Sequence, residues 1–319
     1  MGHRANFVLV DGEGWRLHFG RWAGINMCGL LAAGPAAATR WVAARETRDR
    51  ATGWLDDTWA EGGAVIDHVA EQLIFFGSDP VFSGTGPAFA GFGSDPVLDG
   101  SDVTKGMPVK RAFVALLERT WPGWQVRWAY DGIGDLAAHV GVDRSTVRDA
   151  SYHERQMPAE VVDDLRWPVH LVTSRSGTGS LAAYPFSQCH AAWQGPKLVD
   201  RLPGPGAERL DLPVLPDSGL HLDVARRRVG VWLSRWSKGL VPALAELWPG
   251  WTVTFWGDKY EEQLALCDDL VAVPPVNHAG ALDELESAVE KGKGPLGARR
   301  MPTEQEEWEA VRAAIAALR

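Results

Sequence analysis

Apolar residues recur at every second position in paired short segments of this chain, which predicts β-hairpins separated by helices. The elements expected in the first half are strands at 7–10 and 15–19, a helix at 36–48, strands at 63–67 and 72–76, a helix at 109–120, a strand at 124–128 and a helix at 133–140. Each half therefore has the order ββα-ββα-βα, since the second half follows the same sequence of patterns.

In the second half, the expected elements are strands at 169–173 and 180–184, a helix at 197–202, strands at 219–224 and 229–233, a helix at 240–247, a strand at 251–256 and a helix at 260–266. A further helix is expected at 277–290. Thr303 to Glu306 has a capping-box pattern, which predicts a last helix through Leu318.

Sequence landmarks recur in the same order in both halves and indicate a tandem duplication. The tetrapeptide Trp-Pro-Gly-Trp occurs at 121–124 and again at 248–251. A Gly-Pro pair preceded by a cysteine occurs at 34–35 and at 195–196, and a strand-end aspartate at 67 and at 223. The apolar pair Val8-Leu9 is matched to Leu171-Val172. The two copies of the Trp motif are closer together than those of the earlier landmarks, and the Gly-rich, Ser-rich and Pro-rich stretch at 78–106, which has no counterpart in the second half, accounts for the difference.

These patterns predict an α+β fold made of two homologous lobes, each with an antiparallel sheet and helices on one face. The first repeat lobe is expected at 1–150, with a loop insertion at 78–106 that we expect to be dispensable for folding. The second lobe is expected at 165–290, and a C-terminal helix at 301–319. A groove between the lobes is the expected ligand site.

Composition narrows the functional classes. The net charge of -9 argues against a broad surface for nucleic acid or anionic membrane. No apolar run reaches the ~20 residues needed to span a bilayer, and three cysteines do not make a disulfide framework. A cytoplasmic location is therefore expected. The chain has 16 tryptophans, and the sequence leaves open whether they are core residues or line a groove for a flat ligand.

The segment from Leu136 to Arg148 resembles the helix-turn-helix of many bacterial DNA-binding domains. In that resemblance Gly141 makes the turn, and Arg144, Ser145, Thr146 and Arg148 open a recognition helix. The alternative is a structural helix that ends at Gly141, where glycine is a common C-terminal residue. The acidic chain favours this alternative, and no binding of duplex DNA is expected.

Carboxylates recur at equivalent places in the two halves. Asp131 and Asp258 each follow the Trp-rich strand, and could act as an acid and a base, with Tyr130 or His3 nearby. The alternative is that both aspartates cap the helices that follow. Asp67 and Asp223 favour a turn-forming role instead.

The candidate ligand-binding residues are Arg4, Trp128 and Trp256. No metal-binding or nucleotide-binding motif occurs, so neither a metal nor a cofactor is expected. Cys28 and Cys189 are equivalent, and buried structural thiols are favoured over nucleophiles.

These observations favour a cytoplasmic, pseudo-symmetric binding or accessory protein that recognises a small molecule or a protein segment. One alternative is an enzyme that uses the lobe-equivalent carboxylates, and another is a DNA-binding regulator that uses residues 136–148. The sequence does not specify the ligand or the oligomeric state.

Overall fold

A computed structural model of the chain divides into two compact units. Unit 1 comprises Met1–Ala150 and Val276–Arg319, and unit 2 comprises Ser151–Pro275. The structure describes residues 3–78, 106–149, 160–161, 165, 170–187, 191–204, 206–207, 209–291 and 305–319. Most of the expected loop at 78–106 and the start of the expected capping box at 303 lie outside the described residues.

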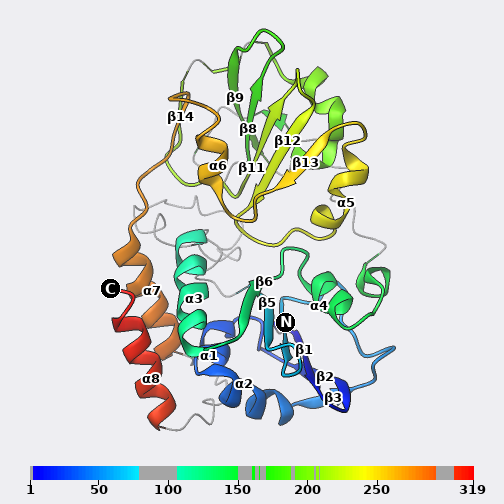
Figure 1. The fold of residues 1–319 in the computed structure, drawn as a ribbon, viewed down its shortest axis with the longest axis vertical. Helices are drawn as coiled ribbons and strands as arrows, with labels where there is room; N and C mark the ends of the chain where they lie inside the picture. The colour runs from blue at the N-terminus through cyan, green and yellow to red at the C-terminus, as the bar shows by residue number, and fades with distance from the viewer. Residues whose placement is uncertain are drawn as a thin grey trace, which may run out of the picture. The chain divides into compact units, whose positions relative to one another are not determined.

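Unit 1 contains a six-stranded sheet with the order β3-β2-β1-β4-β5-β6 (Figure 1). Its strands are β1 (Ala5–Asp11), β2 (Gly14–Gly20), β3 (Glu46–Arg48), β4 (Gly62–Asp67), β5 (Gln72–Gly77) and β6 (Gln125–Trp128). Its helices are α1 (Met27–Leu31), α2 (Gly34–Ala43), α3 (Met107–Thr120), α4 (Ile133–His139), α7 (His278–Lys291) and α8 (Gln305–Ala316), with a 3-10 turn at Arg144–Val147. Helices α7 and α8 both pack on α3, although the sequence division placed residues up to 290 with the second lobe.

Unit 2 contains a second six-stranded sheet, with the order β13-β12-β11-β8-β9-β7. Its strands are β7 (Glu160–Val161), β8 (His170–Arg175), β9 (Leu181–Ser187), β11 (Ser218–Asp223), β12 (Arg228–Leu233) and β13 (Thr252–Phe255). A separate pair joins β10 (Leu210–Asp211) to β14 (Val271–Ala272). The helices are a kinked 3-10 segment, η5 (Ala191–Arg201), together with α5 (Leu240–Leu247) and α6 (Tyr260–Leu264).

Five strands of each unit share one order and one set of pairing directions, whereas the edge strand follows the first hairpin in unit 1 (β3) and precedes it in unit 2 (β7). Hairpins join β1 to β2, β4 to β5, β8 to β9 and β11 to β12. The central pairs β1–β4 and β8–β11 are parallel, as are the outer pairs β5–β6 and β12–β13. The two-lobe α+β class is confirmed, but the sheets are mixed rather than antiparallel. β1 and β4 are parallel because the connection after the first hairpin re-enters the sheet at the end where β2 finishes, so that β4 runs antiparallel to β2. β5 and β6 are parallel because the connection through α3 crosses to the opposite end of the sheet, as crossover connections do, and the strands of unit 2 have the same directions.

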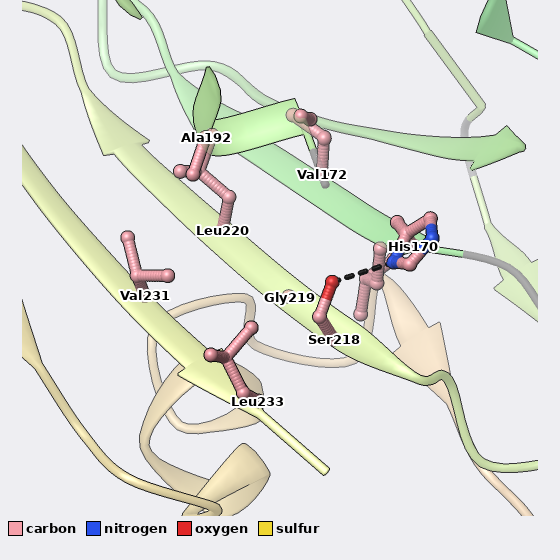
Figure 2. A pocket seen from close by; sticks show the side chains of 10 residues that line it. His170, Val172, Ala192, Ser218, Gly219, Leu220, Val231 and Leu233 are labelled. Carbon is pink, nitrogen blue, oxygen red and sulfur yellow. Dashed lines mark hydrogen bonds between the residues drawn. The ribbon is translucent and has the colours of Figure 1, made fainter. Parts of the chain in front are cut away.

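Helices cover both faces of each sheet rather than the one face expected. In unit 1, Phe113 of α3 packs edge-on against Phe75, with ring centroids 5.5 Å apart. Phe75 is the cross-strand partner of Ala64, so both lie on one face of the sheet. Leu136 of α4 packs against the neighbouring Gly63, which lies on the opposite face. In unit 2, Gln263 of α6 contacts Gly219 as Leu136 contacts Gly63, and Ala192 of η5 lies with Leu220 and Val231 on the opposite face (Figure 2). Both faces of these strands are therefore covered, as is usual for parallel pairs.

Sheet register corrects one match between the halves. Asn6 pairs with Gly63, and Leu171 pairs with Gly219. Leu171 therefore occupies the place of Asn6, not that of Val8. The shift is two residues, which in a strand keeps every side chain on the same face.

The repeated landmarks contact one another inside each unit. The indole N–H of Trp121 donates to the Leu31 carbonyl at 2.8 Å, and that of Trp248 donates to the Ala192 carbonyl at 2.9 Å. Each acceptor lies shortly before the Gly-Pro pair that opens the following helical segment. The Trp-Pro-Gly-Trp turn thus anchors the end of one helix to the start of another. Neither tetrapeptide lies inside a helix, as expected.

Three expected helices differ from the structure. The helix expected at 36–48 ends at Ala43, and residues 46–48 form the edge strand β3. The segment at 197–202 belongs to η5, in which Gly195 has φ +61 and interrupts the helix. The expected recognition helix is the four-residue 3-10 turn Arg144–Val147. Among the described residues, no helix has the length and apolarity needed to cross a membrane.

Candidate functional site

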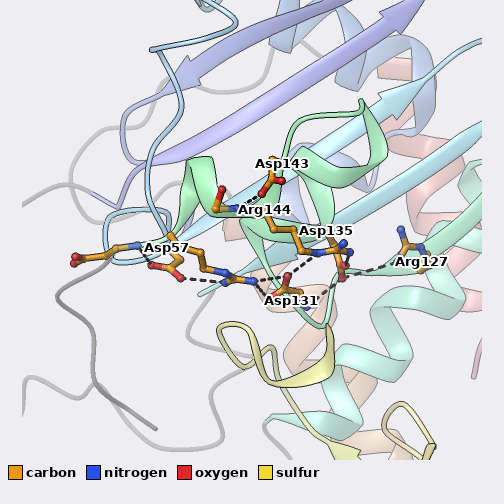
Figure 3. A network of polar contacts seen from close by, with 9 residues as sticks. Asp57, Arg127, Asp131, Asp135, Asp143 and Arg144 are labelled. Atoms are coloured by element: carbon orange, nitrogen blue, oxygen red, sulfur yellow. Dashed lines mark hydrogen bonds and ion pairs between the residues drawn. The ribbon is translucent and has the colours of Figure 1, made fainter. Parts of the chain in front are cut away.

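The candidate carboxylate Asp131 is fully buried in unit 1 and is bound by arginines (Figure 3). Arg148 contacts both of its carboxylate oxygens, and Arg144 Nε donates to Oδ2 at 3.1 Å. Arg148 also donates to Asp57 at 3.0 Å, and Arg144 to Asp135 at 3.1 Å. We call these five residues, with Arg127 beside Asp135, the Asp131 network. Its three carboxylates and three guanidiniums balance in charge.

The network holds Arg148 in its charged form. Burial alone lowers the pKa of Arg148, but hydrogen bonds and charges from Asp131 and Asp57 outweigh burial and raise that pKa above its usual value. A carboxylate bound by two arginines is held as an anion, because protonation would leave both guanidiniums without a counter-charge. Asp131 is therefore built as an ion-pair centre.

The two basic side chains of the helix-turn-helix resemblance are members of the Asp131 network. Arg144 and Arg148, which the resemblance assigns to DNA, are tied to carboxylates of their own unit. Asp143 accepts a hydrogen bond from the Ser145 amide and starts a 3-10 turn, not a longer helix. Helix α4 ends at His139 before Gly141, which has φ +76 as a C-terminal glycine commonly does.

The aspartates at equivalent places are not the N-cap residues of the helices that follow them. The residue before α4 is Gly132 and the residue before α6 is Lys259, and neither helix start receives a side-chain cap. Asp258 is half-buried and its backbone carbonyl accepts from the Tyr260 amide at 2.9 Å. Asp131 and Asp258 thus have different surroundings.

Asp67 and Asp223 form the hairpin turns. Asp67 accepts from the amides of Val69 and Ala70, and Asp223 accepts from that of Arg226. Asp67 also contacts His139 Nε2 at 2.8 Å. Burial alone raises the pKa of Asp67. The hydrogen bonds from the two amides and from His139 lower this pKa by a larger amount, so it lies below its usual value.

Trp128 and Tyr130 lie with a buried lysine in unit 1. The Lys110 ammonium lies 5.2 Å from the Trp128 ring centroid and 5.1 Å from that of Tyr130. Trp128 is buried and also packs edge-on against Phe75. Trp128 and Tyr130, both candidates from the sequence, thus form cation–π contacts with Lys110.

His3 and Arg4 lie at the surface of unit 1 with two tryptophans. The Arg4 guanidinium stacks 4.7 Å from the ring of Trp59, whose side chain is 50% exposed. His3 Nδ1 lies 3.2 Å from a Glu61 oxygen, and its ring lies 6.0 Å from that of Trp22. We call these five residues the Arg4 surface.

Trp256 in unit 2 packs against the sheet. Its ring occupies the place where a side chain at Gly230 would project, and its amide donates to the Val231 carbonyl. Glycine at 230 is thus required for this close approach. Trp256 remains half-buried.

A pair of side chains that the sequence did not single out lies in unit 2. His170 Nδ1 and Ser218 Oγ are 2.6 Å apart at one end of a recess in the sheet (Figure 2). Burial dominates the fall of the His170 pKa to about 4, while Asp217 opposes that fall and Arg235 adds to it. The imidazole is therefore neutral at pH 7. Sequence patterning gave no sign of this pair because the two residues are far apart in the chain and become neighbours only through strand pairing.

A buried polar cluster occupies the opposite face of the same sheet. Gln263 accepts from the Trp232 indole at 2.6 Å and donates to Thr173 at 2.9 Å. Thr173 also contacts His221 Nδ1 at 3.0 Å, and burial lowers the pKa of His221 to about 4. Cys267 donates to the Gln263 carbonyl, and burial raises its thiol pKa. A neutral imidazole beside an un-ionised thiol is not an activated nucleophile.

Within the described ranges, no group of three His, Cys, Asp or Glu side chains could hold a metal ion. Cys28 is buried, and Cys189 lies outside the described residues.

No protein-family model, curated protein or solved structure matches this chain.

Proposed function

We propose that this protein is a cytoplasmic binding or accessory protein that recognises a segment of a partner protein through the Arg4 surface. The observation that carries the proposal is the half-exposed Trp59 with the Arg4 guanidinium stacked on it. Tryptophan and arginine are among the residues most enriched at interface hot spots.

The turn that presents Trp59 is fixed before any partner binds. The Trp59 amide donates to Asp56, and the buried side chain of Asn6 accepts from the Leu55 amide at 2.7 Å. Asp57, close to Trp59 in the chain, is held by Arg148. A rigid turn lowers the entropy lost on binding, which favours recognition.

Trp22 supports the same surface. Its φ of +65 is unusual for a residue with a side chain, and costs on the order of 1–2 kcal/mol. The Asn26 side chain donates to its carbonyl and holds the turn. Strain kept at a surface tryptophan is typical of functional positions.

The partner segment would carry a carboxylate. Arg4 offers a planar set of donors beside an aromatic face, which suits an Asp or Glu side chain next to an apolar residue. Glu61 accepts a hydrogen bond from the Arg4 amide and lies next to His3. Within the described residues, Glu61 forms no ion pair with the Arg4 guanidinium. A small molecule in a groove between the units, the other expectation from the sequence, stays a prediction.

We also propose that the chain arose by tandem duplication and that the protein is located in a reducing compartment. The common strand order and the equivalent indole contacts of Trp121 and Trp248 support the duplication. The buried thiols of Cys28 and Cys267 support a cytoplasmic location. The engagement of Asp131 and Arg144 in ion pairs favours binding over the enzyme and DNA-binding alternatives.

Selection of random displayed peptides against the full chain tests this proposal. We expect the selected peptides to be enriched in Asp or Glu next to an apolar residue. Arg4→Gln or Trp59→Ala should weaken one such peptide by about tenfold or more in fluorescence anisotropy. Higher salt should weaken it as well.

Arg50→Gln is the matched control, since Arg50 also stacks on a tryptophan in unit 1, 5.0 Å from the ring of Trp15. It should leave the peptide affinity unchanged. Selected peptides without acidic residues, or equal binding by Arg4→Gln and the unaltered protein, would refute the proposal.

A further inference from the structure

The turn that carries Trp59 is joined to the last described residues of unit 1. Residues 56–60 form this turn, which we call the Trp59 turn. Residues 147–149, which we call the exit segment, lie just before unit 2 begins at Ser151. The two segments are far apart in the sequence, so only the fold brings them together.

Backbone and side-chain hydrogen bonds hold the Trp59 turn on the exit segment. The Asp57 amide donates to the Val147 carbonyl, and the Asp149 amide donates to Asp57 Oδ1, both at 2.9 Å. Arg148 donates to Asp57 Oδ2 at 3.0 Å, and Figure 3 shows Asp57 at one end of the Asp131 network. The Thr58 hydroxyl donates to Asp149 Oδ2 at 2.8 Å. The amide and both carboxylate oxygens of Asp57 are therefore bound to the exit segment.

Unit 2 closes the equivalent junction with apolar residues. Its β10 pairs with β14, and the Leu212 amide donates to the Ala272 carbonyl as the Asp57 amide does to that of Val147. In both units the first partner lies shortly before the second hairpin, and the second lies where the chain leaves the unit. The side chains that hold the junction of unit 2 are buried and apolar: Leu210, Leu212 and Val271. The fold itself thus needs no charges at this place.

The polar junction of unit 1 lies beside an exposed tryptophan. Trp59 comes two residues after Asp57 and is 50% exposed, whereas Val214, two residues after Leu212, is half-buried. Hydrogen bonds are directional and apolar contacts are not, so the polar junction fixes the orientation of the Trp59 turn more narrowly. The charged residues of unit 1 therefore serve the turn rather than the fold.

The junction is able to open locally. Thr58 is exposed and Asp149 is half-buried, so water competes for the hydrogen bond between them. A partner that binds the ordered Trp59 turn binds the closed junction, and any open population lowers its apparent affinity. By linkage, a bound partner favours the closed junction by the same factor.

We infer that Thr58 and Asp149 are positioning residues of the Arg4 surface, and that docking of the exit segment on the Trp59 turn is coupled to partner binding there. For its ligand this inference rests on the proposed function, whereas the junction is a property of the free protein. The two residues act through Trp59, by holding its turn. Binding at the Arg4 surface thereby stabilises the segment through which the chain passes toward unit 2, and release of that segment weakens binding.

Amide hydrogen exchange of the free full chain tests the junction without any ligand. Thr58→Val removes the hydroxyl that binds Asp149 and nearly keeps the side-chain shape. The amides of Asp57 and Asp149 should then exchange about 2- to 10-fold faster, and by similar factors, because they open together. Amides of β4 should not change, since the core of the unit stays closed.

Thr52→Val is the matched control. The Thr52 hydroxyl also donates to a loop carboxylate of unit 1, that of Asp49, at 2.9 Å. This variant should leave the Asp57 and Asp149 amides unchanged. Equal exchange at these two amides in Thr58→Val and Thr52→Val would refute the positioning role, as would a rise in Thr58→Val that extends equally to β4.

A peptide selected on the Arg4 surface tests the coupling. Thr58→Val and Asp149→Ala should each weaken that peptide by about 2- to 10-fold, and the double variant should lose little more than either single one. In the unaltered protein the peptide should slow exchange at the Asp149 amide. Full peptide affinity in Thr58→Val, with exchange of Asp57 and Asp149 raised, would refute the coupling.

Failure of the proposed function has a different signature. If no selected peptide depends on Arg4, the proposed function and the coupling are both refuted. The exchange difference between Thr58→Val and Thr52→Val does not involve a peptide, so it decides separately whether the junction holds the Trp59 turn.

Discussion

Gly34 and Gly195 are fixed by a close backbone approach as well as by their dihedral angles. Gly34 has φ +87, and a Cβ there would lie 2.7 Å from the Thr120 carbonyl oxygen. Gly195 has φ +61 and would meet the Leu247 carbonyl in the same way. The two glycines let the Trp-Pro-Gly-Trp turn and the Gly-Pro segment touch, which brings each indole N–H to its acceptor.

We predict that Gly34→Ala destabilises the protein by more than Gly123→Ala. Both substitutions place alanine at positive φ, which costs about 1 kcal/mol, but only Gly34 has a neighbour in the way. Urea denaturation of the two variants measures the difference. Equal losses would mean that the backbone at Thr120 moves aside without cost, and that the contact between the landmarks is loose.

At the scale of elements, the Asp131 network joins the loop before β4, α4 and the 3-10 turn of unit 1. Asp57 is far from Arg148 in the sequence, so this ion pair closes a long segment of chain. Asp131 is fully buried and the Arg148 side chain is 22% exposed. Removing one member of such a buried pair leaves the other uncompensated.

We predict that Arg148→Ala lowers the free energy of unfolding by about 3–5 kcal/mol. Arg16→Ala is the matched control, because Arg16 pairs with Asp11 at the surface and such pairs contribute about 0–1 kcal/mol. A double-mutant cycle with Asp131→Ala measures the coupling. A loss for Arg148→Ala no larger than that for Arg16→Ala would show that the network contributes no stability.

The same variant addresses DNA binding. We expect the unaltered protein not to shift duplex DNA at physiological salt, because Arg144 and Arg148 are engaged with Asp131 and the chain is acidic. Salt-sensitive DNA binding that disappears in Arg148→Ala, with folding intact, would favour a regulator.

At the scale of the whole molecule, the buried histidines of unit 2 link stability to pH. Burial lowers the pKa of His170 and of His221 to about 4. Arg175 lowers the pKa of His221 further, whereas Asp223 raises it. In the unfolded chain both imidazoles take up a proton near pH 6.5. Between pH 6.5 and 4 the unfolded state therefore binds more protons than the folded state.

We predict that stability is greatest above about pH 6.5 and falls as the pH is lowered toward 4. Each histidine contributes up to about 1.4 kcal/mol per pH unit in this window. Urea denaturation at several pH values should give a steep slope for the unaltered protein and a shallower one for His221→Gln. The lowered pKa of Asp67 acts in the same direction, but only below its unfolded value near 3.8, so the two effects occupy different pH ranges. An identical slope for His221→Gln would contradict a buried neutral His221.

The candidate site could be predicted only in part. Patterning identified Arg4, Trp128 and Tyr130 as candidates, and all three make cation–aromatic contacts. It missed their partners Lys110 and Trp59, which lie well away from them along the chain. Such contacts are set by packing, because local sequence does not specify which distant side chain stacks on which ring.

The sequence by itself determined the four hairpins, the helix α5 and the place of each Trp-Pro-Gly-Trp turn. These features depend on interactions between near neighbours: alternating apolar residues, turn-forming Asp67 and Asp223, and a glycine at positive φ that ends a helix. Only the tertiary structure decided that β1 pairs with β4 in parallel, that helices cover both faces of each sheet and that Asp131 is an ion-pair centre. It also decided that His170 and Ser218 lie 2.6 Å apart across two paired strands. These outcomes depend on contacts between residues far apart in the chain, whose energies a local pattern does not contain.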